Sequence, residues 1–201
     1  MLDKSDKIDI KEKIIKESAK LFLANGFHGT SVKQITEATG IGRGTLYWYF
    51  KSKDEILESI IYKFNTVFLD GLIDTVSKCE GNFIAKYRTF HKYATEFARD
   101  NRELGLAFNA ILNEIVGTNT KAEGVVKVVY ERYRSFIEDM LENGKKDGSV
   151  RRDIDSTIFA HVIIASHSGM LMQWFVSGET LNIRIFVKAF RDMILKGVTE
   201  K

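Results

Sequence analysis

Apolar residues recur at intervals of three and four along almost the whole chain, and no stretch alternates long enough to predict a strand. This spacing predicts an all-α fold. Glycine, asparagine and clusters of charged residues interrupt the pattern often enough to give about nine helices. Short helices precede residue 52 and longer ones follow it. The pattern therefore predicts an N-terminal three-helix domain over residues 1–52 and a C-terminal helical bundle over residues 53–201.

The first predicted helix spans residues 10–25 and ends at an Asn-Gly-Phe sequence, where the glycine stops it. Ser31 and Gln34 have the spacing of a capping box, so a second helix begins at Ser31; it ends at Gly40. A third helix starts at about Gly42. We expect the first helix to turn one apolar side toward a core, formed by Ile14, Ile15, Ala19, Leu21, Phe22 and Leu23. The three helices should share a small core, in which Leu46 and Phe50 pack against Phe22, Val32, Ile35 and Ala38.

A fourth, longer helix is predicted from Ser52 to Ser77. Ser52 and Glu55 repeat the capping-box spacing at its start. Its apolar residues follow one another at helical intervals and predict a single buried stripe. The residues of this stripe are Ile56, Leu57, Ile60, Ile61, Phe64, Val67, Phe68 and Leu72.

Three adjacent aromatic residues, Tyr47, Trp48 and Tyr49, stand before Phe50 in the third predicted helix. Consecutive side chains of a helix point about 100° apart, so these three cannot all face one core. At least one must face outward. Two short helices joined by the sequence Thr-Gly-Ile-Gly-Arg-Gly form a helix-turn-helix, whose second helix enters the major groove of DNA.

Residue types around this second helix suit contact with double-stranded DNA. Arg43 lies at its start, and its guanidinium matches the O6 and N7 atoms of guanine. Gly42 and Gly44 allow close approach of the backbone, and tyrosine hydroxyls and lysines can hold phosphates. The predicted DNA-binding residues are Ser31, Gly42, Arg43, Gly44, Thr45, Tyr47, Trp48, Tyr49, Lys51 and Lys53. We expect Arg43 and Thr45 to discriminate bases and Tyr49 and Lys53 to hold phosphates.

The net charge of +3 lies at the N-terminal end. Residues 1–54 hold ten Lys and Arg against seven Asp and Glu, whereas residues 55–201 hold twenty of each. Such an asymmetry is typical of a polyanion-binding part joined to a neutral part, although it decides nothing alone. The single cysteine, Cys79, permits no intramolecular disulfide, and the charged start of the chain has no secretory pattern. We therefore expect a cytoplasmic protein.

The stretch LFLANGFHGTSVKQITEATGIGRGTLYWYFKSKDEIL resembles the N-terminal domain of the TetR-type transcriptional regulators. The resemblance covers residues 10–60 and rests on many fixed spacings. It implies a repressor that binds a pseudo-palindromic operator. Trp48 and Tyr49 depart from the commonest pattern of that family, which puts the base preference in doubt. Beyond residue 60 the resemblance concerns architecture alone: a helical domain that dimerises through its last two helices and often encloses a small molecule.

Two features of the C-terminal half fit that implied architecture. Residues 156–178 carry no formal charge, and small residues in them would let a second subunit approach, together with residues 182–195. The predicted homodimer residues are Val162, Ala165, Ser166, Gly169, Phe186 and Phe190. Residues 83–141 are rich in aromatic residues, which suits either an ordinary core or a pocket for a small apolar effector. The predicted ligand residues are Tyr87, Phe90, Phe108, Ile111, Tyr133 and Trp174.

Two other classes of protein stay open at this point. The uncharged segment 156–178 is long enough to cross a membrane, although histidine, serine and glutamine are scattered round it. A helical enzyme or cofactor-binding bundle is the second alternative. The four histidines, at positions 28, 91, 161 and 167, have no di-iron or HExxH spacing, and the glycines near residue 42 satisfy no nucleotide-binding motif. We therefore expect no catalytic residue, no metal, no cofactor and no membrane partner.

Overall fold

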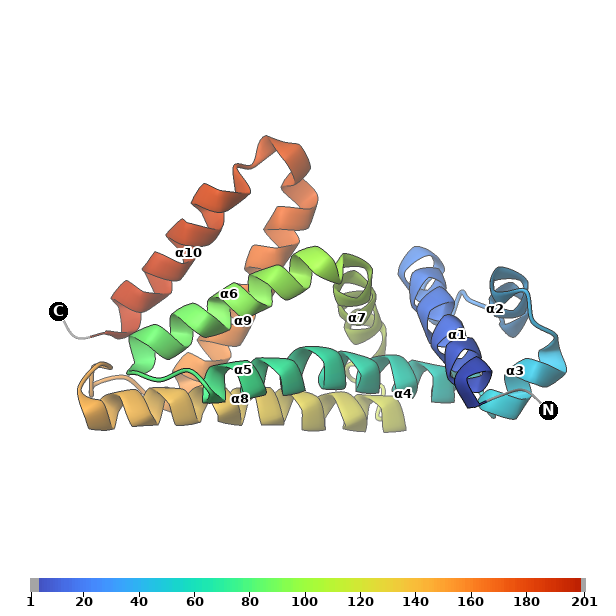
Figure 1. The fold of residues 1–201 in the computed structure, drawn as a ribbon, viewed down its shortest axis with the longest axis horizontal. Helices are drawn as coiled ribbons and strands as arrows, with labels where there is room; N and C mark the ends of the chain where they lie inside the picture. The colour runs from blue at the N-terminus through green and yellow to red at the C-terminus, as the bar shows by residue number, and fades with distance from the viewer. Residues whose placement is uncertain (1–3, 200–201) are drawn as a thin grey trace. The chain divides into compact units, whose positions relative to one another are not determined.

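The computed structural model describes residues 4–199, and within this range all regular secondary structure is helical, as predicted (Figure 1). Because α4, η1 and α5 follow one another without a break, these residues form nine helical segments besides the short turn η2. The elements are α1 (Lys4–Asn25), α2 (Val32–Thr39), α3 (Arg43–Tyr49), α4 (Lys53–Phe64), the π-helical turn η1 (Asn65–Asp70), α5 (Gly71–Ser77), α6 (Phe83–Asp100), α7 (Arg102–Ile115), α8 (Lys121–Asp147), α9 (Ser156–Ser177), the 3-10 turn η2 (Gly178–Thr180) and α10 (Ile183–Val198).

The helices group into two compact units. Of the described residues, the first unit holds those up to Val67 and Asn101–Val129, and therefore α1 to α4, α7 and the start of α8. The second holds Phe68–Asp100 and the described residues from Tyr130 onward, and therefore α5, α6, the rest of α8, α9 and α10. Packing thus places α7 with the N-terminal helices. A division of function between residues 52 and 53 remains a prediction.

The core shared by α1, α2 and α3 consists of fully buried apolar side chains. Phe22, Ile35, Leu46 and Phe50 are each at most 1% exposed. Two residues predicted to face a core lie outside it: Leu23 is 36% exposed, and Ala38 is exposed as well. At the end of α2, the side chain of the next residue, Thr39, is buried instead of that of Ala38. The buried Thr39 hydroxyl donates a hydrogen bond of 2.7 Å to the carbonyl of Ile35, which allows this polar group inside the core.

Of the two predicted capping boxes, the first forms completely and the second by half. The Ser31 hydroxyl accepts from the Gln34 amide, and the Gln34 side chain accepts from the Ser31 amide. At the start of α4, the Ser52 hydroxyl accepts from the Glu55 amide at 3.2 Å. The Glu55 carboxylate, however, accepts from the Lys51 amide at 2.6 Å, one residue before the predicted donor.

The π-helical turn η1 changes which side of the long helix is buried. Val67, predicted in the buried stripe, is 41% exposed, whereas Leu69 is 1% exposed. A π-helical turn closes i to i+5 hydrogen bonds and so holds one more residue than an α-helical turn. The extra residue advances the buried positions from 67 and 68 to 68 and 69. This turn also lies where α6 comes close, since a Cβ at Gly71 would overlap the Tyr93 hydroxyl.

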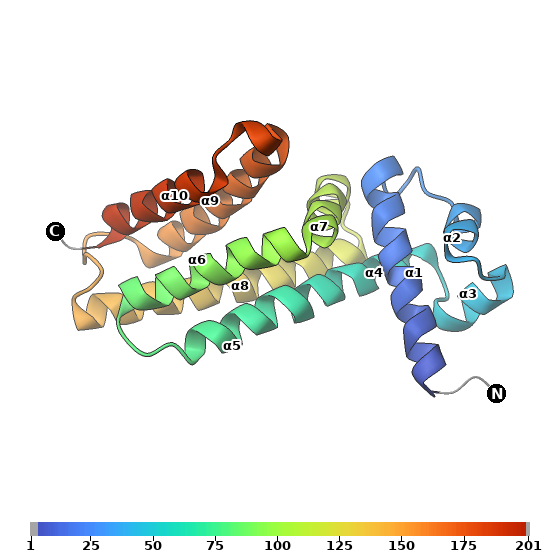
Figure 2. The same cartoon turned by 45° about the horizontal axis from the view of Figure 1, so that its top comes forward.

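Aromatic rings fill the second unit. Phe68 packs against Phe97 at 4.9 Å and against Tyr133 at 5.8 Å between ring centroids. Along α6, Phe83 and Tyr87 stack at 5.7 Å. The helices α9 and α10 form an antiparallel pair joined by η2 (Figure 2).

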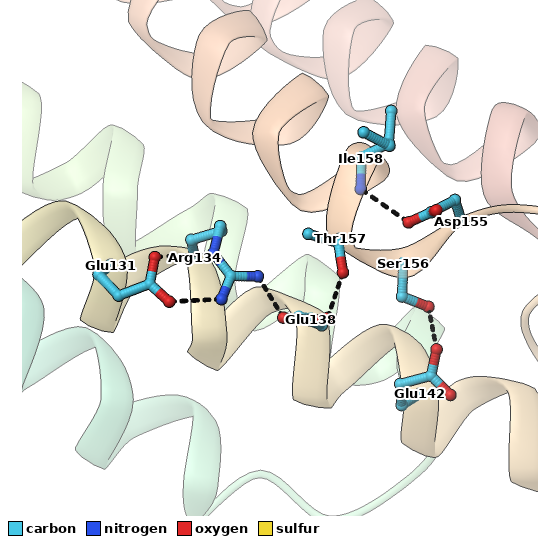
Figure 3. Close-up of polar contacts among 8 residues, drawn as sticks. All are labelled: Glu131, Arg134, Glu138, Glu142, Asp155, Ser156, Thr157 and Ile158. Atoms are coloured by element: carbon cyan, nitrogen blue, oxygen red, sulfur yellow. Dashed lines mark hydrogen bonds and ion pairs between the residues drawn. The ribbon is translucent and has the colours of Figure 1, made fainter.

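The start of α9 is fixed to α8 by polar contacts (Figure 3). The hydroxyls of Thr157 and Ser156 donate to the carboxylates of Glu138 and Glu142, respectively. The Asp155 carboxylate caps the helix by accepting from the Ile158 amide at 3.0 Å. This anchoring sets which face of α9 packs inside the unit and which face stays outside.

Candidate nucleic-acid interface

The turn between α2 and α3 is built by glycine. Gly40 has a φ of 67°, in the left-handed region that glycine adopts without strain, and it ends α2. The amides of Gly40 and Ile41 donate back to the carbonyls of Glu37 and Thr36, so the reversal satisfies the last carbonyls of α2. Gly42 then caps α3 in an extended conformation. The predicted helix-turn-helix is therefore present.

One face of α3 is buried and the remainder is exposed. Leu46 is fully buried, and Phe50, directly after the helix, is 1% exposed. Trp48 is 64% exposed and Tyr47 is 41% exposed, so two of the three adjacent aromatic residues face outward, as the helical geometry requires. The other exposed residues of this helix and its cap are Gly42, Arg43, Gly44 and Thr45.

The exposed side chains of α3 contact one another. The Arg43 guanidinium lies 5.6 Å from the centroid of the Tyr47 ring, one turn further along. Trp48 and Tyr49 meet edge to face at 4.7 Å. Tyr49 is half-buried, and within residues 4–199 its enclosed hydroxyl has no hydrogen-bond partner. Its predicted role in holding a phosphate stays a prediction.

The residues predicted to flank α3 have different environments. Lys51 is exposed, and Ser31 is exposed while capping α2. Lys53 is engaged within the protein, because its ammonium donates to the carbonyls of Phe27 at 2.6 Å and Thr30 at 2.7 Å. The same ammonium lies 4.4 Å from the centroid of the Phe27 ring. A phosphate contact by Lys53 stays a prediction, since its ammonium already forms these contacts within the protein.

The loop from Gly26 to Thr30, which joins α1 to α2, is also held from α7. The Glu114 carboxylate accepts from the amides of Phe27 at 2.9 Å and His28 at 3.2 Å. The approach is close: a Cβ at Gly26 would lie 2.7 Å from a carboxylate oxygen of Glu114. Sequence reasoning missed Glu114, since a contact across 87 positions leaves no local pattern.

The structure groups only part of the predicted ligand set. Phe90 lies 5.6 Å from Tyr87 and 6.0 Å from Tyr133 between ring centroids, all in the second unit. Phe108 and Ile111 belong to the first unit, where Phe108 stacks on Phe64 at 3.8 Å. Trp174, in the second unit, stacks on the neighbouring Phe175. A shared role in ligand binding stays a prediction.

Two histidines that carried no sequence motif are buried beside this aromatic group. His91 is 2% exposed and His167 is 4% exposed, whereas His28 and His161 are exposed. Burial lowers the pKa of His91 to about 4, although its hydrogen bond to the carbonyl of Val187 acts in the opposite direction. Burial also lowers the pKa of His167 to about 3. Both rings are therefore neutral near pH 7.

The predicted dimer residues lie on or beside an exposed apolar stripe of α9. Val162, Ala165 and Gly169 are exposed, and Ser166 is half-buried. Phe186 and Phe190 in α10 are half-buried. Of the described helices, α9 alone has the length and composition to cross a membrane, with a mean hydropathy of 1.2. Most of that stretch is not covered by the rest of the chain.

The fold and the exposed α3 define a helix-turn-helix protein of the kind that binds DNA. Residues 14–60 match the sequence model of the family described as bacterial regulatory proteins, tetR family. The helix-turn-helix region of this chain is therefore similar to that of the tetR family.

Relatives match over nearly the full length at low identity. The transcriptional repressor KstR2 of Mycolicibacterium smegmatis is 24% identical over 198 residues, which cover 94% of this chain and 91% of the relative. The fatty acid metabolism regulator protein of Bacillus subtilis is 19% identical, with coverages of 94% and 95%.

Solved structures share the fold. The MbdR regulator of Azoarcus sp. CIB aligns with a TM-score of 0.83 and 24% identity, covering 95% of this chain and 100% of that one. FadR of Bacillus subtilis, solved in complex with stearoyl-CoA, aligns with a TM-score of 0.80 and 17% identity, covering 92% and 98%. These two proteins are regulators by their descriptions, and the likeness places α4 to α10 in the same architecture.

Proposed function

We propose that this protein is a cytoplasmic, sequence-specific DNA-binding repressor that acts as a homodimer and leaves its operator when a small, largely apolar molecule binds. The observation that carries the proposal is the exposure of α3 immediately after a helix-turn-helix turn. Arg43, Thr45, Tyr47 and Trp48 are all exposed on one short helix whose opposite face is fully buried. A soluble protein has no structural need for that arrangement, whereas a major-groove reader does.

Base recognition is assigned to the start of α3. The Arg43 guanidinium presents the paired donors that guanine accepts at O6 and N7, and Thr45 adds a hydroxyl and a methyl group. Tyr47, in contact with Arg43, limits the directions in which the guanidinium can point. Lys51 contributes positive charge at the other end of the helix, which suits a phosphate and carries no sequence information.

Dimerisation is assigned to the exposed stripe of α9 and the neighbouring face of α10. Exposed residues of α9 recur at alternating steps of four and three: Ile158, Val162, Ala165, Gly169, Met172 and Val176. In α10, Ile185 and Met193 are 66% and 57% exposed. Two such helices from each subunit can form a four-helix contact about a twofold axis. The operator would then be pseudo-palindromic.

Gly169 offers a clean test of this interface. A Cβ at Gly169 meets nothing within 4 Å, so a larger side chain does not disturb the single subunit. Gly169→Glu should therefore give a folded monomer that has lost specific affinity for DNA, as measured by sedimentation and DNA binding. A wild-type protein that sediments as a monomer at micromolar concentration would refute the dimer.

The effector is assigned to the second unit because its core is aromatic and its size exceeds what dimerisation requires. The relatives support an apolar effector: one is named a fatty acid metabolism regulator, and a FadR structure holds stearoyl-CoA. We assign Tyr87, Phe90 and Tyr133 to the binding region, with Trp174 of the same unit as a further candidate. Phe108 and Ile111 belong to the first unit and are left out of this assignment.

Release from DNA requires coupling between the two units. The chain passes between them through the continuous helix of α4, η1 and α5, through the junction of α6 with α7, and within α8. In the first unit, Lys53 of α4 and Glu114 of α7 both hold the loop that precedes α2. A hundredfold loss of DNA affinity needs about 2.7 kcal/mol of coupling, and DNA must then weaken ligand binding by the same factor.

The experiment that tests the proposal is a selection of genomic DNA fragments with the purified full-length protein, followed by footprinting. We expect one enriched inverted repeat, protected at two half-sites on the same face of the duplex. Calorimetry of a ligand with and without this operator then tests whether ligand and DNA weaken each other's binding by the same factor. A protein that enriches no sequence is not a sequence-specific regulator.

A further inference from the structure

Three polar side chains meet inside the aromatic part of the second unit. The Tyr87 hydroxyl lies 3.1 Å from Nε2 of His167, and Nε2 of His91 lies 2.9 Å from the carbonyl oxygen of Val187. The rings of His91 and His167 are 5.2 Å apart between centroids, at 70° to each other. Within residues 4–199, the Nδ1 atoms of both histidines are buried without a hydrogen-bond partner.

The hydrogen bond to Val187 fixes the tautomer of His91. A carbonyl oxygen accepts only, so His91 carries its proton on Nε2 and presents a bare lone pair at Nδ1. The Tyr87 hydroxyl can either donate to Nε2 of His167 or accept from it, and the arrangement in which it donates leaves His167 with its proton on Nδ1. In that arrangement the two unpaired positions are complementary: one buried acceptor and one buried donor on adjacent rings.

The surroundings of this pair are apolar on most sides. Phe90 and Phe190 both lie edge to face with the ring of His167, at 5.0 and 5.2 Å. Leaving a buried donor and a buried acceptor unpaired costs stability, so such groups are uncommon unless they serve a ligand. Two charged groups of α10, Arg191 and Asp192, act on the pKa of His91 in opposite directions and pair with each other.

We propose that His91 and His167 bind the neutral hydroxyl group of a ligand with an aromatic or alicyclic apolar body. This inference rests on the proposed function and names the chemical class of its effector. A hydroxyl is the small group that donates to His91 and accepts from His167 at the same time.

Charged head groups fit the pair less well. A carboxylate accepts only, so it leaves the lone pair of His91 unpaired, and its burial beside two neutral rings is costly. An ammonium donates only, and leaves the His167 donor unpaired in the same way. The low pKa of both histidines, set first by burial, means that neither ring supplies a positive charge near pH 7.

The test compares 2-naphthol with naphthalene and 2-naphthoate by equilibrium dialysis against the full-length protein at pH 7. We expect 2-naphthol to bind at least about tenfold more tightly than either. In the variant Tyr87→Phe with His167→Phe, both partners of one hydrogen bond are removed together, so no new unpaired group is left. Its preference for 2-naphthol over naphthalene should fall about fivefold, the value of one hydrogen bond.

The matched control makes the same two changes at exposed positions of the first unit: Tyr62→Phe with His28→Phe. It should keep the wild-type preference. Nitrogen-15 NMR of the imidazoles gives a second measurement that needs no variant. Signals of two buried histidines should shift with 2-naphthol and not with naphthalene.

Equal binding of 2-naphthol and naphthalene, no binding of either, or an unchanged preference in the double variant would overturn the proposal. If water already forms hydrogen bonds with both Nδ1 atoms, a ligand hydroxyl gains nothing there. In that case 2-naphthol and naphthalene bind equally. DNA binding, measured on the same samples, separates this inference from the proposed function. The double variant should still bind the selected operator, and a wild-type protein without a specific DNA site would refute the function alone.

Discussion

The first unit exposes a large aromatic side chain of a kind that usually lies in a protein core. The second unit instead buries two polar histidine side chains. Trp48 on α3 is 64% exposed, whereas His91 and His167 on α6 and α9 are at most 4% exposed. Both departures from the hydrophobic pattern cost stability, and natural proteins tend to keep such departures at functional sites. The comparison supports the proposal that the first unit binds a partner on its surface and the second unit binds one in its interior.

Acid pH should affect the second unit most. The pKa values of about 4 for His91 and about 3 for His167 lie below the ordinary 6.5. The unfolded chain therefore binds protons that the folded chain does not, and stability falls as pH drops from 6.5 towards 4. The two rings together contribute at most about 2.7 kcal/mol per pH unit.

Denaturant titrations at pH 7 and pH 5 measure this loss. The variant Tyr87→Phe with His167→Phe removes one of the two histidines and should show a slope about 1.4 kcal/mol per pH unit shallower. The exposed pair Tyr62→Phe with His28→Phe should keep the wild-type slope. Identical slopes in all three proteins would mean that these buried rings do not control the acid response.

Glu114→Gln should be the largest single change in the first unit. The carboxylate accepts from two backbone amides, and hydrogen bonds to a charged acceptor are worth about 1.5–3 kcal/mol. An amide side chain has one oxygen to offer, so we expect a loss of about that size in the free energy of unfolding. Glu103→Gln, at an exposed position of the same helix, is the control. Equal stability of the two variants would show that the Glu114 carboxylate does not stabilise the loop that precedes α2.

The difference between predicted and missed features follows from distance along the chain. The Ser31 capping box and the outward aromatic residues of α3 depend on neighbours within four positions, so the sequence pattern contains them. The Glu114 contact joins residues 87 positions apart, and no local motif predicts the π-helical turn η1 within the long helix. A buried histidine has no pattern of its own, so the sequence does not distinguish His91 and His167 from His28 and His161.

Lys53→Ala and Lys51→Ala should separate structure from DNA contact at the end of α3. The Lys53 ammonium holds two carbonyls and the Phe27 ring, so its loss should cost about 1–3 kcal/mol of stability and weaken binding to all DNA sequences alike. Lys51 is exposed, so its loss should leave stability unchanged and reduce the salt slope of binding by about one. Thermal unfolding and salt titrations report these two effects independently, and a stable Lys53→Ala protein would contradict the first.

Gly44→Ala tests close approach of the α3 backbone to DNA with the smallest expected change in stability. Nothing lies within 4 Å of a Cβ at Gly44, and alanine favours a helix by up to about 1 kcal/mol over glycine. The variant should be as stable as the wild type or slightly more stable, while its DNA affinity falls. Gly105→Ala, also open and also helical, should gain stability without losing DNA affinity. Unchanged DNA binding by Gly44→Ala would show that the backbone stays away from the duplex.

The most direct measurement of the central claim is the affinity of the wild type and of Arg43→Ala for the selected operator and for every single-base substitution of it. If α3 reads the major groove, Arg43→Ala costs about 1–3 kcal/mol on the operator and relaxes the preference at one position of each half-site. The other positions keep the wild-type order of preference. An equal loss on every DNA sequence, with no position relaxed, would contradict the assignment of base recognition to α3.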